Sequence, residues 1–145
     1  MTGRVSTATS SKAKSQAKQR TSWRVAETLS KSFRYAGNGV LYATATQRNF
    51  RIHLGMGALA LTLGAVLHVS FIELAILGLT VAVVLALELI NTAIEATVDL
   101  IIGDQYHQLA GIAKDCAAGA VLVSACASLF VAACVLLPAL WRVFV

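Results

Sequence analysis

Charged residues are scarce in this chain of 145 residues. Only 13% of the residues are charged, whereas 57% are hydrophobic, and soluble domains carry roughly 25% charged residues. Seven acids, three cysteines and one proline do not fit an acidic disordered chain, a disulfide scaffold or collagen. So little charge cannot cover the surface of a soluble domain. The composition therefore predicts an integral membrane protein of one domain.

The few charges are unevenly distributed along the chain. Residues 1–51 hold ten of the twelve basic residues and one acid, and residues 52–145 hold two basic residues and six acids. Residues 1–22 are polar and lack apolar periodicity, which predicts a disordered basic tail near an anionic membrane surface. A transit peptide is the alternative, and a secretory signal is not expected because no apolar run follows the basic region.

The remaining residues, 23–145, are expected to form one membrane domain. Residues from about 23 to 50 mix apolar, aromatic and basic side chains, which favours an amphipathic helix in the membrane interface over a simple linker. Three apolar stretches follow, and each is long enough to span a bilayer as a helix. They cover about residues 52–70, 71–102 and 107–141. The predicted fold is all-α, with three transmembrane helices and a surface helix.

The charge distribution also predicts an orientation. The connection near residues 64–73 is almost free of charge, whereas the N-terminal arm is strongly basic. Because positive segments stay in the cytoplasm, we expect a multi-pass protein of the cell inner (plasma) membrane with a cytoplasmic N-terminus. The turn at residues 103–106 would then also lie in the cytoplasm.

Four polar residues lie on one face of the second apolar stretch. Their spacing of three, four and four residues aligns them along an α-helix, and we call this row the acidic stripe: Glu88, Asn91, Glu95 and Asp99. Charged groups facing lipid are costly, so the stripe should face protein or water. Lys114 or a divalent cation could balance it, and oxygen ligands favour Mg²⁺. The spacing alone supports an enzyme, an ion pathway or a packing device.

Two segments closely resemble the prokaryotic diacylglycerol kinase family, which includes undecaprenol kinases. They are ELINTAIEATVD at residues 88–99 and YHQLAGIAKDCAA at residues 106–118. Shorter segments at residues 33–36 and 49–53 are also similar, and the resemblance extends from about residue 32 to the C-terminus. It implies a homotrimeric membrane enzyme with active sites between subunits, which uses Mg²⁺ to move the γ-phosphate of ATP to a lipid hydroxyl. No nucleic acid partner is expected.

The resemblance also implies roles for individual residues. Glu88 corresponds to the base that takes the proton of the lipid hydroxyl, and Glu95 corresponds to a ligand of both metal and nucleotide. Gln47 stands where family members often have a metal-binding glutamate, so weaker metal binding is expected. Asp99 completes the stripe. The positions expected near the nucleotide are Tyr35, Gln47, Asn91, Glu95, Gln105, Tyr106, His107, Lys114 and Asp115.

The function expected from the resemblance is phosphorylation of diacylglycerol to phosphatidic acid. The first alternative is undecaprenol kinase activity, since both lipids would need an apolar pocket. The second is a non-catalytic membrane protein or an ion pathway, which Gln47 makes worth testing. The sequence contains no Walker A motif and no kinase glycine-rich loop, so the nucleotide would be held by another arrangement.

Overall fold

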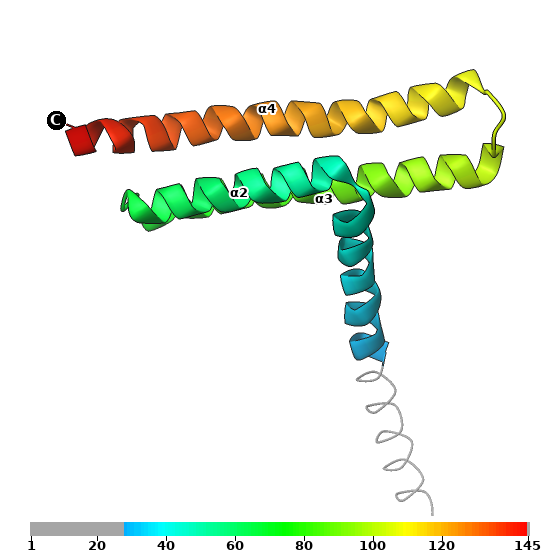
Figure 1. The fold of residues 1–145 in the computed structure, drawn as a ribbon, viewed down its shortest axis with the longest axis horizontal. Coiled ribbons are helices and arrows are strands. Elements are labelled where there is room, and N and C mark those ends of the chain that lie inside the picture. The colour runs from blue at the N-terminus through cyan, green and yellow to red at the C-terminus, as the bar shows by residue number, and fades with distance from the viewer. Residues whose placement is uncertain (1–27, 145) are drawn as a thin grey trace, which may run out of the picture. The chain divides into compact units, whose positions relative to one another are not determined.

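The computed structural model describes residues 28–144, and these residues form helices joined by short turns (Figure 1). Residues 28–46 are helical, and three longer helices follow. They are α2 (Arg48–Val66), α3 (Phe71–Ile102) and α4 (Gln108–Phe144). Residues 28–144 contain no β-strand. The predicted all-α class is confirmed, whereas the predicted basic tail at residues 1–22 lies outside the described residues.

The chain divides into two units, residues 1–40 and 41–145. In the first unit, residues 28–40 are helical and their side chains are exposed. The predicted surface helix at residues 23–50 is interrupted, because Gln47 has an extended backbone (φ −95°, ψ 113°) and separates the first helical segment from α2. The division into a tail and a membrane domain that starts at residue 23 stays a prediction.

Helices α2 and α3 form an antiparallel hairpin. The turn includes His68, whose φ is 53°, and it ends in a capping box. The Ser70 amide donates to Glu73 Oε2 (2.7 Å), and the Glu73 amide donates to Ser70 Oγ (3.2 Å). This reciprocal cap satisfies backbone donors at the start of a helix. It explains why an acid stands in the first turn of α3, whose first half is otherwise free of charge.

Close packing fixes how α2 lies against α3. Gly57 of α2 is buried, and a Cβ atom at this position would lie 2.5 Å from Cγ1 of Val81 on α3. Gly64, near the C-terminal end of α2, is also buried and lies next to Leu74 and Leu77. Glycines at such contacts let helix backbones approach closely. The two glycines therefore set the separation of α2 and α3.

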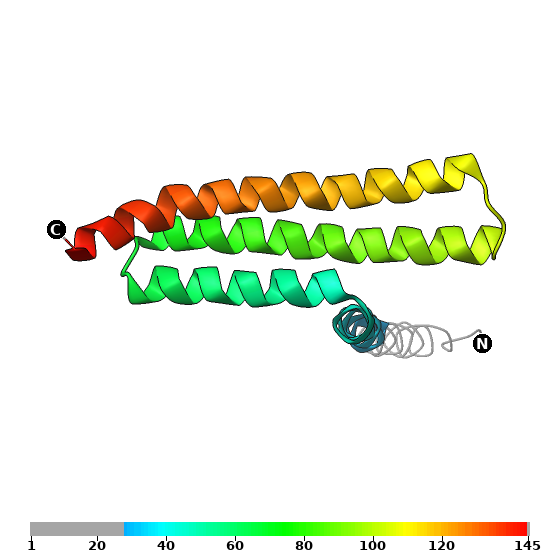
Figure 2. The same cartoon turned by 45° about the horizontal axis from the view of Figure 1, so that its top comes forward.

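Helix α4 returns along α3 after a turn at residues 103–107, and Figures 1 and 2 show α2 and α4 each running beside α3. Gly103 ends α3 with a φ of 55°, a backbone conformation that residues other than glycine rarely adopt. Its amide donates to the carbonyl of Asp99 (2.9 Å). The turn thus begins directly after the acidic stripe.

Two of these helices, α3 and α4, are long and apolar enough to span a membrane. Helix α2 is less suited, because its first turn carries Arg48 and Arg51 and the helix already ends at Val66. The uncharged part, residues 52–66, covers about 22 Å at 1.5 Å per residue, whereas the hydrocarbon core is about 30 Å thick. The first predicted span is therefore shorter than residues 52–70.

The contact at Gly57 gives a test of the hairpin. We expect Gly57→Ala to lower the thermal unfolding midpoint in detergent, because the new methyl group must displace Val81, whose branched side chain is stiff in a helix. Overpacking of this kind costs about 1–3 kcal/mol. Gly55→Ala is the matched control, because nothing lies within 4 Å of its Cβ position.

A second substitution identifies the cause of that loss. Val81→Ala in the Gly57→Ala background should recover most of the lost stability, because it removes the clashing methyl group. Equal unfolding midpoints for Gly57→Ala and Gly55→Ala would show that α2 and α3 are not in close contact at this point.

Candidate functional site

The acidic stripe lies on the face of α3 that continues the buried apolar row of the same helix. The buried residues of α3 are Leu77, Val84, Glu88 and Thr92. Exposure rises along the stripe: Glu88 is 3% exposed, Asn91 and Glu95 are half-buried, and Asp99 is exposed. The stripe therefore runs from the interior of the helix packing to the open end of α3.

Glu88 is a buried carboxylate with one potentially cationic neighbour. His53 of α2 places Nε2 3.3 Å from Glu88 Oε1, and the two side chains are 24% and 4% exposed. The contact lacks hydrogen-bond geometry, and Oε1 has no hydrogen-bond partner in the described chain. The neighbouring Thr92 hydroxyl donates to the carbonyl of Glu88 (2.9 Å) and not to its carboxylate. The carboxylate is thus free to accept a further hydrogen bond.

Asn91 and Glu95 form the middle of the stripe. Asn91 Nδ2 donates to Glu95 Oε1 (3.1 Å), and Asn91 Oδ1 is buried without a partner. An unpaired amide oxygen beside a carboxylate is a donor set that suits a hard cation such as Mg²⁺. Residues 28–144 contain no group of three or more His, Cys, Asp or Glu side chains that could hold a metal. A cation here would therefore need oxygen ligands from water or a substrate.

Lys114 of α4 lies at the open end of the stripe. Its Nζ contacts Asp99 Oδ1 at 2.5 Å, and the two side chains are 36% and 59% exposed. Lys114 was one of two candidates for a positive charge near the stripe, and the structure brings it to Asp99. Because the pair is open to solvent, it adds little to stability. Lys114 is therefore available to a negatively charged ligand.

The other predicted site residues of this unit lie in the α3–α4 turn, in the first turns of α4 and directly before α2. Gln105, Tyr106 and His107 form the exposed α3–α4 turn, and Asp115 is exposed next to Lys114. Gln47 precedes α2, is half-buried and makes no capping hydrogen bond with its side chain.

Tyr35 belongs to the other unit of the chain. It is 63% exposed, and the guanidinium carbon of Arg34 lies 5.6 Å from its ring centroid.

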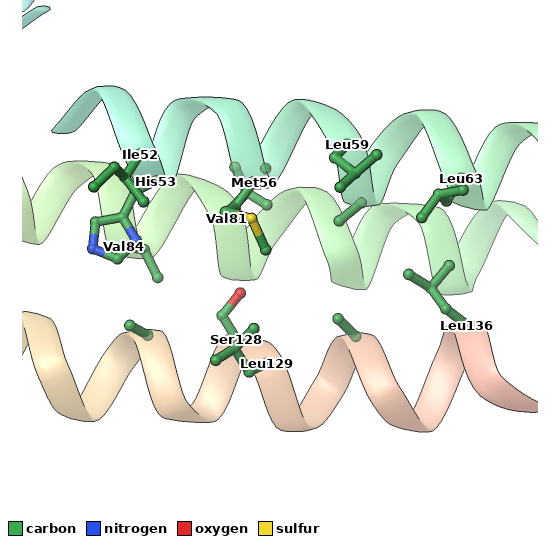
Figure 3. Close-up of a pocket in the computed structure, with 14 residues that line it drawn as sticks. Ile52, His53, Met56, Leu59, Leu63, Val81, Val84, Ser128, Leu129 and Leu136 are labelled. Atoms are coloured by element: carbon green, nitrogen blue, oxygen red, sulfur yellow. The ribbon is translucent and has the colours of Figure 1, made fainter. Parts of the chain in front are cut away.

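A largely apolar cavity of about 430 Å³ lies between the three long helices. Figure 3 shows His53 at one end of this cavity and Leu63 and Leu136 at the other. Its polar lining groups are the side chains of His53 and Ser128. The remaining lining residues are Ile52, Met56, Gly57, Leu59, Ala60, Leu63, Val81, Val84, Ala125, Leu129, Ala132 and Leu136. His53 therefore connects an apolar cavity with the buried carboxylate of Glu88.

His53 is the site residue that the sequence did not identify. Its position near the start of an apolar stretch indicated only a place at the membrane interface. The hairpin itself held a usable signal, because His53 and Glu88 are 14 and 18 residues from the two ends of the turn at residues 67–70. These distances along α2 and α3 differ by only about one helical turn. An antiparallel hairpin therefore brings the two side chains within reach of each other.

These contacts combine three chemical capabilities. Glu88 can accept a proton, the Asn91–Glu95 pair offers oxygen ligands, and Lys114 supplies a mobile positive charge. The cavity beside His53 can accept an apolar chain. The arrangement therefore suits a reaction between an apolar molecule with a polar head and a negatively charged water-soluble molecule.

Comparison with known proteins identifies a family that the chain matches. Residues 34–136 match the family described as "Prokaryotic diacylglycerol kinase". A protein of Synechocystis named "Diacylglycerol kinase" is 53% identical over 127 residues, which cover 88% of this chain and 73% of that protein.

Two further relatives cover less of the chain. An "Undecaprenol kinase" of Bacillus subtilis is 44% identical over 110 residues, 76% of this chain and 89% of that protein. A "Diacylglycerol kinase" of Escherichia coli is 37% identical over 90 residues, 62% of this chain and 73% of that protein.

Proposed function

This chain belongs to the prokaryotic diacylglycerol kinase family, and we propose that it transfers the γ-phosphate of ATP to the hydroxyl group of diacylglycerol. The product would be phosphatidic acid. The observation that carries this proposal is the buried carboxylate of Glu88, which lies beside His53 at the end of an apolar cavity. Part of the apolar chain of a membrane lipid would pack against the cavity lining and bring the lipid hydroxyl group to this carboxylate.

The length of α3 supports a place for Glu88 near one face of the membrane. Helix α3 has 32 residues, and Glu88 follows Phe71 by 17, which is about 26 Å along the helix. If Phe71 lies at one headgroup layer, Glu88 lies within about 4 Å of the other side of a hydrocarbon core that is about 30 Å thick. The rest of the acidic stripe would then extend into the polar layer, where ATP has access.

We propose that the protein crosses the plasma membrane three times. Its basic N-terminus would lie in the cytoplasm. Helix α2 would be the third span, since its apolar residues run along α3 and its two arginines stand at the end near Glu88. Long basic side chains can reach the headgroups from such positions. This orientation puts the stripe and the turn at residues 103–107 on the cytoplasmic side.

In the proposed reaction Glu88 acts as the general base. The lipid hydroxyl oxygen forms a bond to the γ-phosphorus, its proton passes to the Glu88 carboxylate, and the bond from the γ-phosphorus to the bridging oxygen of ADP breaks. Glu95 and Gln47 would hold Mg²⁺ together with the amide oxygen of Asn91, and the bound metal would neutralise phosphate charge. Lys114 would bind the phosphates, and Asp115 would line the same site.

The residues proposed to hold the nucleotide are exposed to solvent in a single chain. Gln105, Tyr106 and His107 are exposed in the turn, and Tyr35 is exposed in its own unit. Because one chain leaves Glu95 half-exposed and Asp99 exposed, we propose that a homotrimer encloses the site. A symmetric assembly with shared sites would supply the missing wall.

Undecaprenol kinase activity is the second candidate function. The relative from Bacillus subtilis carries that name and aligns over 89% of its own length. The cavity supports either lipid, because twelve of its fourteen lining residues are apolar or glycine. An isoprenoid chain and an acyl chain are both apolar, so the lining does not discriminate between them.

A direct assay tests the proposed function and its alternatives. Membranes containing the protein are incubated with labelled ATP, Mg²⁺ and either diacylglycerol or undecaprenol, and the labelled lipid is measured. We expect label in phosphatidic acid. Label only in undecaprenyl phosphate would favour the second candidate, and no labelled lipid in either arm would contradict a lipid kinase.

Glu88→Gln tests the proposed base. The amide cannot take the hydroxyl proton, so we expect turnover to fall by at least about 100-fold, which is the usual contribution of a general base. ATP affinity and assembly should change little. Glu73→Gln is the control, because glutamine also completes a capping box. A Glu88→Gln enzyme with more than about a tenth of wild-type turnover would remove Glu88 from this role.

Gln47→Glu tests the metal site. A carboxylate binds Mg²⁺ better than an amide oxygen, so we expect a lower Mg²⁺ concentration at half-maximal activity. Asn49→Asp adds the same charge to the first turn of α2 and serves as the control. An unchanged or higher Mg²⁺ requirement in Gln47→Glu would show that Gln47 does not face the metal.

Mixed trimers test the shared site. Glu95→Ala and Arg51→Ala chains are first assayed alone to establish that each is inactive, and they are then co-expressed so that trimers with both kinds of chain can be purified. If Glu95 and Arg51 of neighbouring subunits form one site, each mixed trimer has one intact site of three, and roughly a third of wild-type activity should return. Inactive mixed trimers would show that each chain builds its own site.

A further inference from the structure

His53 is the polar side chain at the entrance from the apolar cavity to Glu88. It lies in α2 one helical turn before Gly57, a buried residue at which α2 packs closely against Val81 of α3. Its Nε2 atom is 3.3 Å from Glu88 Oε1, and the imidazole also lines the cavity (Figure 3). One side chain therefore contacts both the buried carboxylate and the space proposed for the lipid.

Glu88 has no other partner of this kind in the described chain. Its carboxylate is 4% exposed, and Oε1 lacks a hydrogen bond. Asn91 uses its amide group on Glu95, and the Thr92 hydroxyl bonds to a backbone carbonyl. In residues 28–144 the ion pairs that involve the stripe are His53 with Glu88 and Lys114 with Asp99. A buried carboxylate without a donor is costly, so His53 is the group available to stabilise it.

We propose that His53 is a positioning residue for the lipid kinase reaction. Its Nε2–H would donate to Glu88 Oε1, so that Oε2 faces the hydroxyl group of the lipid in the cavity. The inference rests on the proposed function, since it assigns a partner to the proposed base. Contacts of catalytic residues are often long before substrate binds and shorten in the complex. The observed separation of 3.3 Å is already close to hydrogen-bond distance, so the proposed bond requires a change in angle more than in position.

This role separates the imidazole from the proton transfer itself. The hydroxyl proton passes to Oε2 of Glu88, while the Nε2–H bond stays on Oε1 and keeps the carboxylate oriented. Any side chain of similar reach with an N–H donor should therefore serve. A side chain of similar size without a donor should fail. The proposed ATP site is formed by other residues, so the affinity for ATP should not change.

The test compares His53→Phe with His53→Gln in the full-length protein in lipid-containing micelles. We expect His53→Phe to lower kcat about 10- to 100-fold, because a misplaced catalytic group costs up to about that much. KM for ATP should stay within twofold of wild type. His53→Gln should retain at least about a third of wild-type kcat, because its amide N–H replaces the ring donor.

Control variants keep the result clear of folding effects. His68→Asn removes a histidine in the turn after α2, and asparagine tolerates the positive φ of that position, so this variant should have wild-type kcat. Helix content and assembly are measured for every variant. If His53→Phe does not assemble, His53→Gln is compared with His53→Leu instead.

Three results would overturn the inference. They are wild-type kcat in the variant without a donor, loss of kcat in His53→Gln as well, or a parallel rise in KM for ATP. A wild-type protein that phosphorylates neither lipid would instead contradict the proposed function. The two failures are therefore distinguishable in the same assay.

Discussion

The burial of one carboxylate, that of Glu88, constrains the structure around it. Glu88 continues the row of Leu77 and Val84 on the buried face of α3 and is only 3% exposed. An isolated charge in such surroundings costs several kcal/mol, so a donor must reach it. The imidazole of His53 on α2 lies 3.3 Å from this carboxylate, and Gly57 lets the backbone of α2 approach Val81 one helical turn away. The hairpin packing and the site chemistry thus depend on the same contact.

Much of this fold could be predicted from the sequence, because apolar length and helical period are local properties. The stretch at residues 71–102 coincides with α3, and the spacing of the acidic stripe places its members on one face. The sequence also contains a signal for where the turn after α2 ends. Ser70 and Glu73 form the pattern of a capping box, which marks the start of the next helix. The break at Gln47 has no such signal, since neither glycine nor proline stands there.

The contacts between helices were harder to predict, because they depend on register. Lys114 could be foreseen near the stripe as the only basic residue in a long segment, although Asp99 could not be singled out as its partner. The approach of His53 to Glu88 depends on where the turn at residues 67–70 begins and how closely α2 and α3 pack. A shift of two residues in the hairpin would turn His53 away from α3. Single-sequence patterns do not fix such a shift, whereas the buried Gly57 and Gly64 do.

The gradient of exposure along the stripe also limits where the proposed reaction can occur. Glu88 and Asp99 are 11 residues apart, about 16 Å along α3, with the buried end suited to a lipid hydroxyl and the open end to a charged nucleotide. Reacting atoms must come within about 3–3.5 Å. A hydroxyl bound to Glu88 therefore requires the γ-phosphate to lie within about one helical turn of it, beside Asn91. The unpaired Oδ1 of Asn91 and the Glu95 carboxylate stand at this level, where the phosphate would need its charge balanced. The α- and β-phosphates and the adenine of ATP would then extend away from Glu88, toward Lys114 and the open end of α3.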